Sequence, residues 1–488
     1  MNLTWSFGRS ALRFRMTIAR AAPGALVCAL SATVLSAVAF SSQDSEAGAP
    51  DETSLDERER RLDEQEARLQ AMETELRGLL DEASGPESDR NGNADRSLPR
   101  ASATDVMEHQ PDAGLGRGEG YTDSRFLKSV PLFGSDWRFS FGGYAKVDVL
   151  HDFDGVGDPN QFVLAQIPVD GNPQPGSYTT LQAKETRFNF EVRDMGADLG
   201  KSRFFVEFDF FDQQNTSSTR LRHAYFEYGD WLVGRNWTTL TELRQLPLLL
   251  DFAAGDSLYG NRTEQIRYQA DFSEDYNWAV AIENFADDAI LNSGMVEGTA
   301  RSDFPRLVGR IGYESESAVV TFGLSLSQNR WDGTGAVDDE SELAWSAMTG
   351  GRVYTDVERG DFIGFGASIG DGEPGNILTF ANGGVPNAVL DGAGNLENIE
   401  SWHANVAFHK EWSSRWSSNF SLAYAELDPV ANLPLDTIEI GTSAHANLVL
   451  QVAPQVRTGL EYMRGTRENV SGSDGSADRV QFSIFYYF

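Results

Sequence analysis

Alternation between apolar and polar residues is the dominant pattern in the second part of the chain. It is clearest at residues 479–488, where every second residue from Val480 to Phe488 is apolar and the other set begins with Arg479 and Gln481. Strict period two indicates a β-strand between an apolar and a polar environment. Aromatic residues crowd its end, as in strands that cross a membrane–water interface. Taken alone, this strand also fits a soluble β-sandwich.

Similar segments recur from residue 137 to the end of the chain. We predict about sixteen strands, within residues 144–150, 182–192, 203–211, 221–228, 231–238, 263–272, 276–285, 304–313, 318–330, 342–354, 361–370, 402–410, 415–426, 437–450, 456–465 and 479–488. Short turns and long loops connect them. Because this is the pattern of an outer-membrane barrel, we predict an all-β antiparallel transmembrane barrel over residues 137–488, with its short turns and both ends in the periplasm. A propeller or repeated sandwich would show an internal repeat, and none is visible.

The alternation also assigns each side chain to the lumen or to lipid. Arginine or lysine facing lipid at mid-membrane would cost about 2–4 kcal/mol, so we place these residues inward. The predicted pore-lining and anion-binding residues are Lys146, Arg187, Arg193, Arg203, Arg267, Arg306, Arg310, Arg457 and Arg479. They either brace the wall by pairing with carboxylates or form a positive lumen that selects anions. For an anion pore, the acidic partners should lie on a different wall.

One predicted strand, residues 221–228, does not fit this scheme. Neither of its two alternate sets is apolar throughout, because Arg222 and His223 fall in different sets. Contact of one face with another subunit instead of lipid would explain this.

Residues 239–262 are too long for a surface turn and contain the apolar run 246–250. Apolar loop residues need a surface to pack on, and the inner wall of the barrel is available. We therefore predict a loop that folds inward and narrows the pore, with an exposed lid as the alternative. The predicted constriction residues are Leu246, Leu250, Asp251, Phe252 and Asp256.

The N-terminal segment predicts export. Residues 1–39 combine arginines, an apolar run and the small-residue motif Ala37-Val38-Ala39, which is typical of a cleaved signal peptide. Cleavage after Ala39 would also remove Cys28, the only cysteine. The mature protein would then contain no disulfide bond.

Two further segments precede the barrel. Leucines recur every seven residues from Leu55 to Leu76, which predicts a coiled-coil helix over residues 51–83, as a parallel dimer or trimer. A single charged helix is the alternative. Residues 84–136 are rich in Gly, Pro, Ser and Asp and are predicted to form a disordered tether. The helical arm would lie in the periplasm.

Composition and charge exclude several classes of function. The formal net charge of −33 repels nucleic acid. A catalytic site would need a nucleophile, a base and an orienting group within hydrogen-bond reach, and the 6 histidines form no such motif. An outer-membrane hydrolase is therefore the disfavoured alternative, and we predict no enzyme, no metal site and no cofactor.

Several short motifs resemble those of known porins. The strand 234–237 and the segment 250–256 resemble the strand and constriction loop of general porins. A more specific resemblance, to DcaP-like trimeric outer-membrane porins, is carried by residues 141–148, 221–225, 265–268, 459–468 and 479–488. The resemblance implies a sixteen-stranded homotrimer with a periplasmic coiled-coil arm that passes small anions such as dicarboxylates.

These observations predict an outer-membrane porin for passive diffusion of small anionic solutes through a trimeric, arginine-lined and loop-constricted pore. Its partners would be outer-membrane lipid, the solutes and two further copies. A non-selective general porin is one alternative. Another is a structural envelope protein that links the outer membrane to the periplasm through residues 51–83.

Overall fold

The computed structural model describes residues 129–132, 136–172, 176–194, 202–211, 218–253, 256–284, 289–334 and 338–488. The predicted signal peptide 1–39, the coiled-coil segment 51–83 and the tether residues 84–128 lie outside this part of the chain. Within it, no helix has the length and apolar character needed to cross a membrane.

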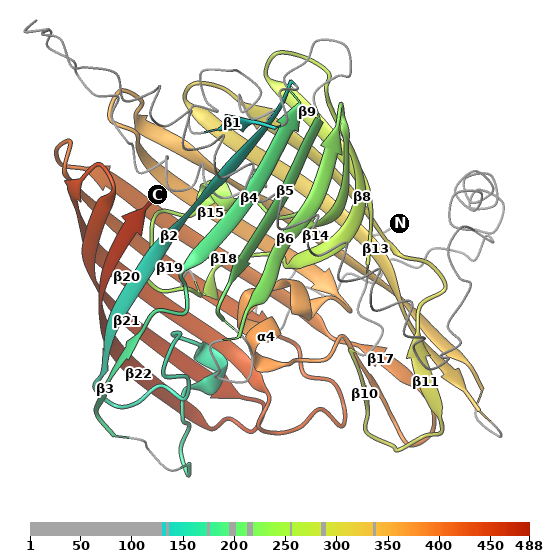
Figure 1. Cartoon of the computed structure of the whole chain (residues 1–488). Helices are drawn as coiled ribbons and strands as arrows, with labels where there is room; N and C mark the ends of the chain where they lie inside the picture. The colour runs from blue at the N-terminus through green and yellow to red at the C-terminus, as the bar shows by residue number, and fades with distance from the viewer. Residues whose placement is uncertain are drawn as a thin grey trace, which may run out of the picture. The chain divides into compact units, whose positions relative to one another are not determined.

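Sixteen long strands in the described residues form one closed antiparallel β-barrel. They are β2 (Trp137–Asp152), β4 (Arg187–Asp194), β5 (Ser202–Asp209), β6 (Arg220–Tyr228), β7 (Trp231–Trp237), β8 (Arg262–Asp271), β9 (Tyr276–Glu283), β12 (Arg306–Glu314), β13 (Ala318–Gly333), β14 (Glu340–Asp356), β15 (Asp361–Asp371), β18 (Glu400–Glu411), β19 (Trp416–Leu427), β20 (Ile438–Ala453), β21 (Val456–Asn469) and β22 (Asp474–Tyr487). The first and last strands close the barrel by pairing from Tyr144–Tyr487 to Asp152–Arg479, and they lie side by side in Figure 1. The predicted barrel is confirmed.

The described part of the chain also contains shorter strands, 3-10 turns and one helix in addition to the sixteen long strands. The strands β1 (Val130–Pro131), β3 (Tyr178–Gln182) and β11 (Gly298–Arg301) extend its sheet, and β10 (Ile290–Asn292), β16 (Ala388–Leu390) and β17 (Leu396–Asn398) form a small separate sheet. The loops contain the 3-10 turns η3 (Leu164–Gln166), η4 (Leu243–Gln245) and η6 (Pro374–Asn376) and the helix α4 (Leu378–Gly383). The prediction of one strand over residues 182–192 is wrong. The chain turns after β3, where the Thr186 N–H donates to the Ala183 carbonyl at 3.1 Å.

The two faces of the barrel wall differ as the alternation predicts. On the outside, Val147 and Leu460 expose 42% and 54% of their surface, whereas their inward neighbours Lys146 and Glu461 expose 1% and 0%. Apolar side chains therefore face outward and charged side chains inward, as expected for a barrel in a lipid bilayer.

Strand β6 carries a β-bulge at Arg222. Glu207 pairs with His223 and Phe208 pairs with Leu221, so the backbone of Arg222 has no register partner in β5. The consecutive residues Arg222 and His223 are both buried inside the barrel, because a bulge shifts the alternation by one residue. This shift explains the mixed sequence pattern, and the predicted contact of one face with another subunit stays a prediction.

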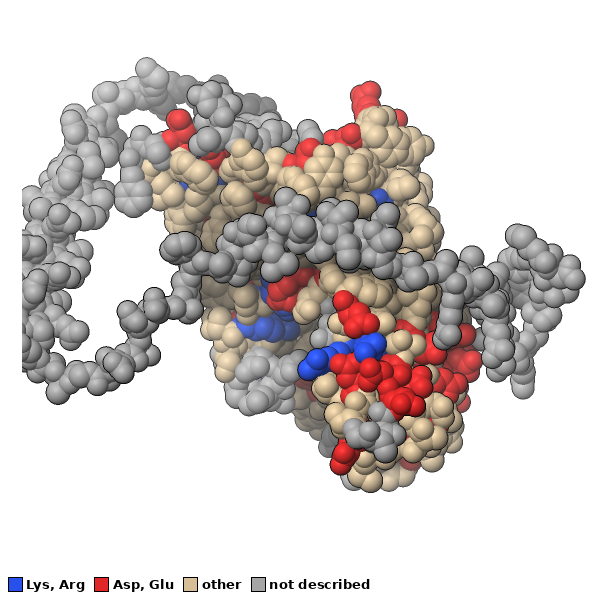
Figure 2. Space-filling model, turned by 90° about the vertical axis from the view of Figure 1, so that its right-hand side faces the viewer, with Lys and Arg blue, Asp and Glu red and all other residues tan. Residues whose placement is uncertain are grey.

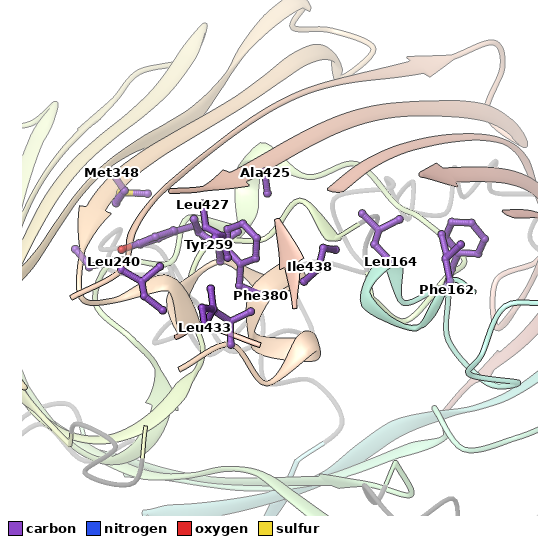
Figure 3. Packing of buried hydrophobic residues seen from close by; sticks show 14 of the residues in the cluster. Phe162, Leu164, Leu240, Tyr259, Met348, Phe380, Ala425, Leu427, Leu433 and Ile438 are labelled. Carbon is purple, nitrogen blue, oxygen red and sulfur yellow. The ribbon is translucent and has the colours of Figure 1, made fainter. Parts of the chain in front are cut away.

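Three long connections fold into the barrel and form an apolar cluster there, which we call the inner plug. Figure 3 shows Phe162 and Leu164 from the first loop, Leu240 and Tyr259 from the segment between β7 and β8, and Phe380 of α4 converging inside the wall. All five side chains are at least 98% buried. The sequence predicted inward folding only for residues 239–262; the first loop and the loop with α4 do so as well.

Small wall residues make room for the inner plug. A Cβ on Gly465 would lie 2.5 Å from Leu164 Cδ2, and one on Gly441 would lie 2.7 Å from Thr379 Cγ2. The glycines of these strands therefore allow the loops to pack directly on the backbone of the wall.

Acidic side chains gather most densely at the end of the barrel that carries the long loops (Figure 2). At this end Arg330 pairs with Asp303, Asp332 and Asp339. The inner wall is an additional location, because Asp148, Glu207 and many other carboxylates are buried there.

Candidate functional site: the constricted lumen

The segment between β7 and β8 lies against the inner wall over much of its length. Its Glu242 carboxylate accepts hydrogen bonds from Arg310 Nη2 at 2.7 Å and from the Thr321 hydroxyl at 2.7 Å. Burial would raise the pKa of Glu242, but the adjacent Arg244 and Arg310 hold that pKa well below its usual range. The ionised carboxylate thus anchors the start of the segment. The predicted inward fold of residues 239–262 is confirmed.

The middle of the segment is fixed by its backbone. The Leu250 N–H donates to Glu461 at 2.6 Å, and its carbonyl accepts from Lys146 Nζ at 2.5 Å and from Gln481 Nε2 at 2.7 Å. The Leu250 side chain is fully buried against Val449. Charged wall residues therefore bind the backbone of the loop while an apolar side chain packs between them.

Asp251 and Asp256 connect this segment to the other inward loops. Asp251 Oδ1 accepts the Phe162 N–H at 2.9 Å, and Asp256 Oδ2 accepts the Leu164 N–H at 3.1 Å. Asp256 Oδ1 also accepts from Asn382 Nδ2 at 3.1 Å. Burial raises the pKa of Asp251 to about 6 and that of Asp256 to about 7. Asp256 is thus a junction of all three loops.

The nine predicted basic residues all lie on the inner face of the barrel. Eight of them are buried, and Arg203 is half-buried. Ion pairs connect Lys146 to Glu185 and Asp148, Arg187 to Glu185, Arg193 and Arg203 to Glu191, Arg306 to Glu283, Arg310 to Glu242, and Arg479 to Asp152. Arg457 Nε donates to Gln451 at 2.9 Å, and Arg267 lies beside Gln265 on β8. Their predicted role in anion binding remains a prediction.

Most of these acidic partners are on the same strand as their arginine or on the next one. Glu191 and Arg193 share β4, and Glu283 of β9 faces Arg306 of β12. The expectation that the acidic partners of an anion pore occupy a separate wall therefore does not hold. The paired side chains brace the wall between strands, which is the first of the two roles considered for them.

A cavity of about 570 Å³ separates the constriction segment from the wall formed by β4–β8. We call it the arginine cavity, because its wall side carries Arg187, Arg220, Arg222, Arg235 and Arg262. Its loop side is mainly apolar and consists of Leu243, Leu246, Pro247, Leu248, Leu249, Phe252 and Ala253. Of the nine predicted basic residues, Arg187 lines this cavity.

Two carboxylates next to these guanidiniums, Glu207 and Asp209, are not part of the cavity lining, whereas Glu185, which pairs with Arg187, and Asp251 are. Asp209 receives bidentate hydrogen bonds from Arg220 at 2.9 and 2.7 Å, and Glu207 accepts from Arg222 at 2.7 Å. Both acids are almost fully buried, whereas the Arg220 side chain is 33% exposed. Glu207 and Asp209 therefore hold the guanidiniums of Arg220 and Arg222 in place at the cavity wall.

Phe252 brings the constriction segment to this cluster. Its ring lies 5.1 Å from the Arg220 guanidinium carbon and 5.7 Å from those of Arg187 and Arg222. It also stacks on Phe211 with a centroid distance of 4.1 Å. The predicted constriction residue Phe252 thus lies where loop and wall approach each other, and Leu246 and Asp251 line the same cavity.

Arg262 differs from its neighbours in its partners. Its Nε donates to His223 Nε2 at 3.2 Å, and its guanidinium lies 3.8 Å above the Trp237 ring. Within the described ranges, no carboxylate forms an ion pair with it. Sequence reasoning missed Arg220, Arg222 and Arg262 as cavity residues. The bulge in β6 breaks the alternation that would have assigned Arg220 and Arg222 to the lumen. Arg262 is the first residue of β8, at a position where the alternation predicts an outward side chain.

Among the residues that the structure describes, no group of three or more His, Cys, Asp or Glu side chains could hold a metal ion. The closed barrel, its apolar outside and its loop-narrowed, charged interior define an outer-membrane channel of the porin class. The chain belongs to the DcaP outer membrane protein family, whose model matches residues 127–488.

Several solved structures of outer-membrane proteins are similar to this chain, and the DcaP channel shows the same fold. The outer membrane channel DcaP of Acinetobacter baumannii superposes with a TM-score of 0.64 at 19% identity, covering 74% of this chain and 100% of that one. OmpT of Vibrio cholerae matches with a TM-score of 0.45 at 13% identity over 73% and 99% of the two chains. An anion-selective porin from Comamonas acidovorans matches with a TM-score of 0.46 at 11% identity over 72% and 100%. A search of curated proteins found no match.

Proposed function

We propose that this porin allows passive diffusion of small organic anions, carboxylates in particular, through the arginine cavity. The observation that carries the proposal is the arrangement of Arg187, Arg220, Arg222 and Arg262 along one side of that cavity, whose lining includes Glu185 and Asp251 but not Glu207 and Asp209, the partners of Arg222. The proposal includes no catalytic step and no cofactor.

The guanidiniums would act as a series of exchangeable binding groups. A planar guanidinium binds a carboxylate through two parallel N–H···O bonds, and this bond is stronger where water is scarce. Arg220 already engages Asp209 in this way, which shows the geometry the side chain adopts with a carboxylate. Passage requires binding that is favourable but weak enough for release, which several neighbouring sites provide better than one deep site.

The loop side of the cavity would favour the organic part of the solute. Leu246, Leu249 and Phe252 offer apolar surface opposite the arginines. A carboxylate with a hydrocarbon body can therefore contact both sides at once, whereas a small inorganic anion contacts one. We infer a preference for organic acids over chloride.

We further propose that the protein is exported, resides in the outer membrane as a homotrimer and carries its N-terminal arm in the periplasm. Support comes from the signal-peptide pattern of residues 1–39 and from the heptad pattern of residues 51–83. The fold likeness to porins, one of which was solved in a trimer form, agrees with this assembly.

The reversal potential of the refolded protein under a salt gradient tests the anion preference. Wild type is expected to reverse toward the anion potential. Arg262→Gln removes a charge that has no described acidic partner, so it should lower the anion-to-cation permeability ratio several-fold without breaking an ion pair. Arg330→Gln, at the loop end and paired with three acids, is the control and should change the ratio little.

Cation preference in the wild-type protein would overturn the proposal and leave the arginines as wall braces. Equal passage of anions and cations would favour a non-selective general porin. Absence of conductance would favour the structural role of the arm.

A further inference from the structure

The lining of the arginine cavity combines aromatic rings with its guanidiniums. Tyr144 of β2, Trp237 of β7 and Phe485 of β22 belong to the wall, and Phe252 belongs to the constriction segment. Phe211, which follows β5, also lines the cavity. The cavity volume of about 570 Å³ lies within the range of about 300–1,000 Å³ that is usual for small-molecule sites. Rings and cations in one lining fit a solute that has an aromatic body and an anionic group.

The Phe252 ring shows how this lining accommodates an aromatic group. It stacks on Phe211 and lies 5.1 Å from the guanidinium carbon of Arg220 and 5.7 Å from those of Arg187 and Arg222. A guanidinium within about 6 Å of a ring centroid is attracted to the negative face of the ring. Phe252 is half-buried and lines the cavity, so part of its ring remains available to a second ring. A solute ring beside Phe252 would meet the same three cations.

Arg262 supplies donors for the anionic group. Its Nε donates to His223 at 3.2 Å, and its guanidinium carbon lies 3.8 Å from the centroid of the Trp237 ring. Among the described residues, none accepts a hydrogen bond from its Nη1 and Nη2 groups. A carboxylate binds such a pair of N–H groups through two parallel hydrogen bonds. Both groups of Arg262 are therefore available to the carboxylate of a solute.

The surroundings of Arg262 favour an anion at this position. Arg222, Arg187 and Arg220 are close enough to repel its charge. A bound carboxylate would relieve this repulsion, because an opposite charge lowers the electrostatic energy of the whole group. The Trp237 ring that supports Arg262 is buried in an apolar cluster, so binding requires little reordering of this side chain.

The rest of the lining disfavours a second charge on the solute. Opposite the arginines lie Leu246 and Leu249, where a second carboxylate would lose its hydration without gaining a donor. Glu185 and Asp251 also line the cavity and would repel that carboxylate. A saturated ring with one carboxylate avoids both costs, but it lacks the π face that attracts guanidiniums and other rings. The lining therefore favours an acid with one charge and an aromatic ring.

We propose that the arginine cavity is a binding site for aromatic monocarboxylates such as benzoate. The carboxylate binds the Nη1 and Nη2 groups of Arg262, and the ring lies toward Phe252 among the guanidiniums of Arg187, Arg220 and Arg222. This site narrows the class of solutes in the proposed function, and the passage of the bound acid rests on that function. Binding of the acid can be measured without passage.

Isothermal titration calorimetry of the refolded protein tests the solute class. Benzoate and cyclohexanecarboxylate form a matched pair, since both are rings of similar size with a single carboxylate and only benzoate is aromatic. Benzoate should bind about three- to tenfold more tightly, the range expected for a favourable aromatic pair. Succinate, a dicarboxylate, should bind more weakly than benzoate. Equal affinity for the two ring acids, or tighter binding of succinate, would overturn the proposal.

Substitutions of two phenylalanines test the position of the ring. Phe252→Leu should remove most of the advantage of benzoate, whereas Phe252→Tyr, which keeps the ring, should retain it. Phe362→Leu is the matched control and should also retain it. The Phe362 ring of β15 lies 5.0 Å from the Arg352 guanidinium but does not line the arginine cavity. Loss of the advantage in both leucine variants, or in neither, would contradict the placement of the ring beside Phe252.

Arg262→Gln tests the carboxylate end of the site. It should weaken the binding of both ring acids about tenfold or more, because charge-assisted hydrogen bonds are lost, and leave their ratio unchanged. Unchanged affinity would rule out the role of Arg262. These results are separate from the reversal potential. An anion-selective pore with equal affinities would overturn only the aromatic preference, whereas a cation-selective pore would overturn the proposed function whatever the affinities are.

Discussion

At the scale of single residues, buried carboxylates hold the inward loops against the barrel wall by accepting hydrogen bonds. Glu242, Glu461 and Asp256 each accept hydrogen bonds from a different part of the inward loops or their supporting wall. An ionised carboxylate that accepts charge-assisted bonds is among the strongest polar contacts available in a protein. Asp256 differs from Glu242 because it has no arginine partner among the described residues, and burial dominates its titration.

The junction at Asp256 should make the protein less stable as the pH rises. Burial raises the pKa of Asp256 from 3.8 to about 7, so the folded protein binds this proton more tightly than the unfolded chain. Stability is then lost between about pH 4 and 7, by at most about 1.4 kcal/mol per pH unit. The Tm of the refolded protein should be lower at pH 8 than at pH 5. Asp256→Asn cannot ionise and should flatten this dependence; an unchanged slope in this variant would assign it to another group.

At the scale of elements, glycines in the wall decide how closely the loops can approach. A Cβ on Gly364 of β15 would lie 1.8 Å from the Gln245 carbonyl oxygen, and one on Gly366 would lie 1.9 Å from Gln245 Oε1. The 3-10 turn η4 therefore rests on bare strand backbone. A side chain at either position would push the constriction segment away from its wall.

Gly364→Ala should displace the constriction segment and change the single-channel conductance. The clash is with a backbone atom, so rotation of a side chain cannot relieve it. Gly309→Ala is the matched control, because a Cβ on Gly309 of β12 meets nothing within 4 Å. Planar-bilayer recordings of both refolded variants make the comparison. Identical conductance in the two variants would show that the segment does not limit the passage.

At the scale of the whole molecule, the barrel has two different kinds of wall. The β18 side is uncharged over a long outer stretch, and the β4–β7 side is short, aromatic and interrupted by a charged pair. The arginine cavity lies between the constriction segment and this short wall.

The N-terminal arm can be tested at this scale. Deleting residues 51–83 should lower the temperature at which the assembly separates into single copies, because a parallel coiled coil would hold three chains together. The conductance of each pore should stay the same, since the barrel begins at residue 137. Heated gel electrophoresis and single-channel recording measure the two effects. An assembly of unchanged heat stability would make the arm an attachment device.

The sequence by itself determined the barrel, the strand number and the inward position of the basic residues. The reason is local: period-two alternation records which side of a strand faces lipid, and an arginine in lipid costs too much to be tolerated. It also determined the inward course of residues 239–262, because the apolar run 246–250 needed a surface. The short motifs indicated the DcaP-like porin family, and the family match over residues 127–488 confirms this prediction.

Only the tertiary structure decided which arginines face open space. Arg222 is placed by a bulge that depends on its partner strand, and Arg262 reaches its position because β6 and β7 separate. Most predicted arginines are instead neutralised by acids on neighbouring strands, as Arg479 is by Asp152. Such pairings join residues far apart in the chain, and no local pattern encodes them. The inner plug likewise depends on three loops meeting inside the closed wall.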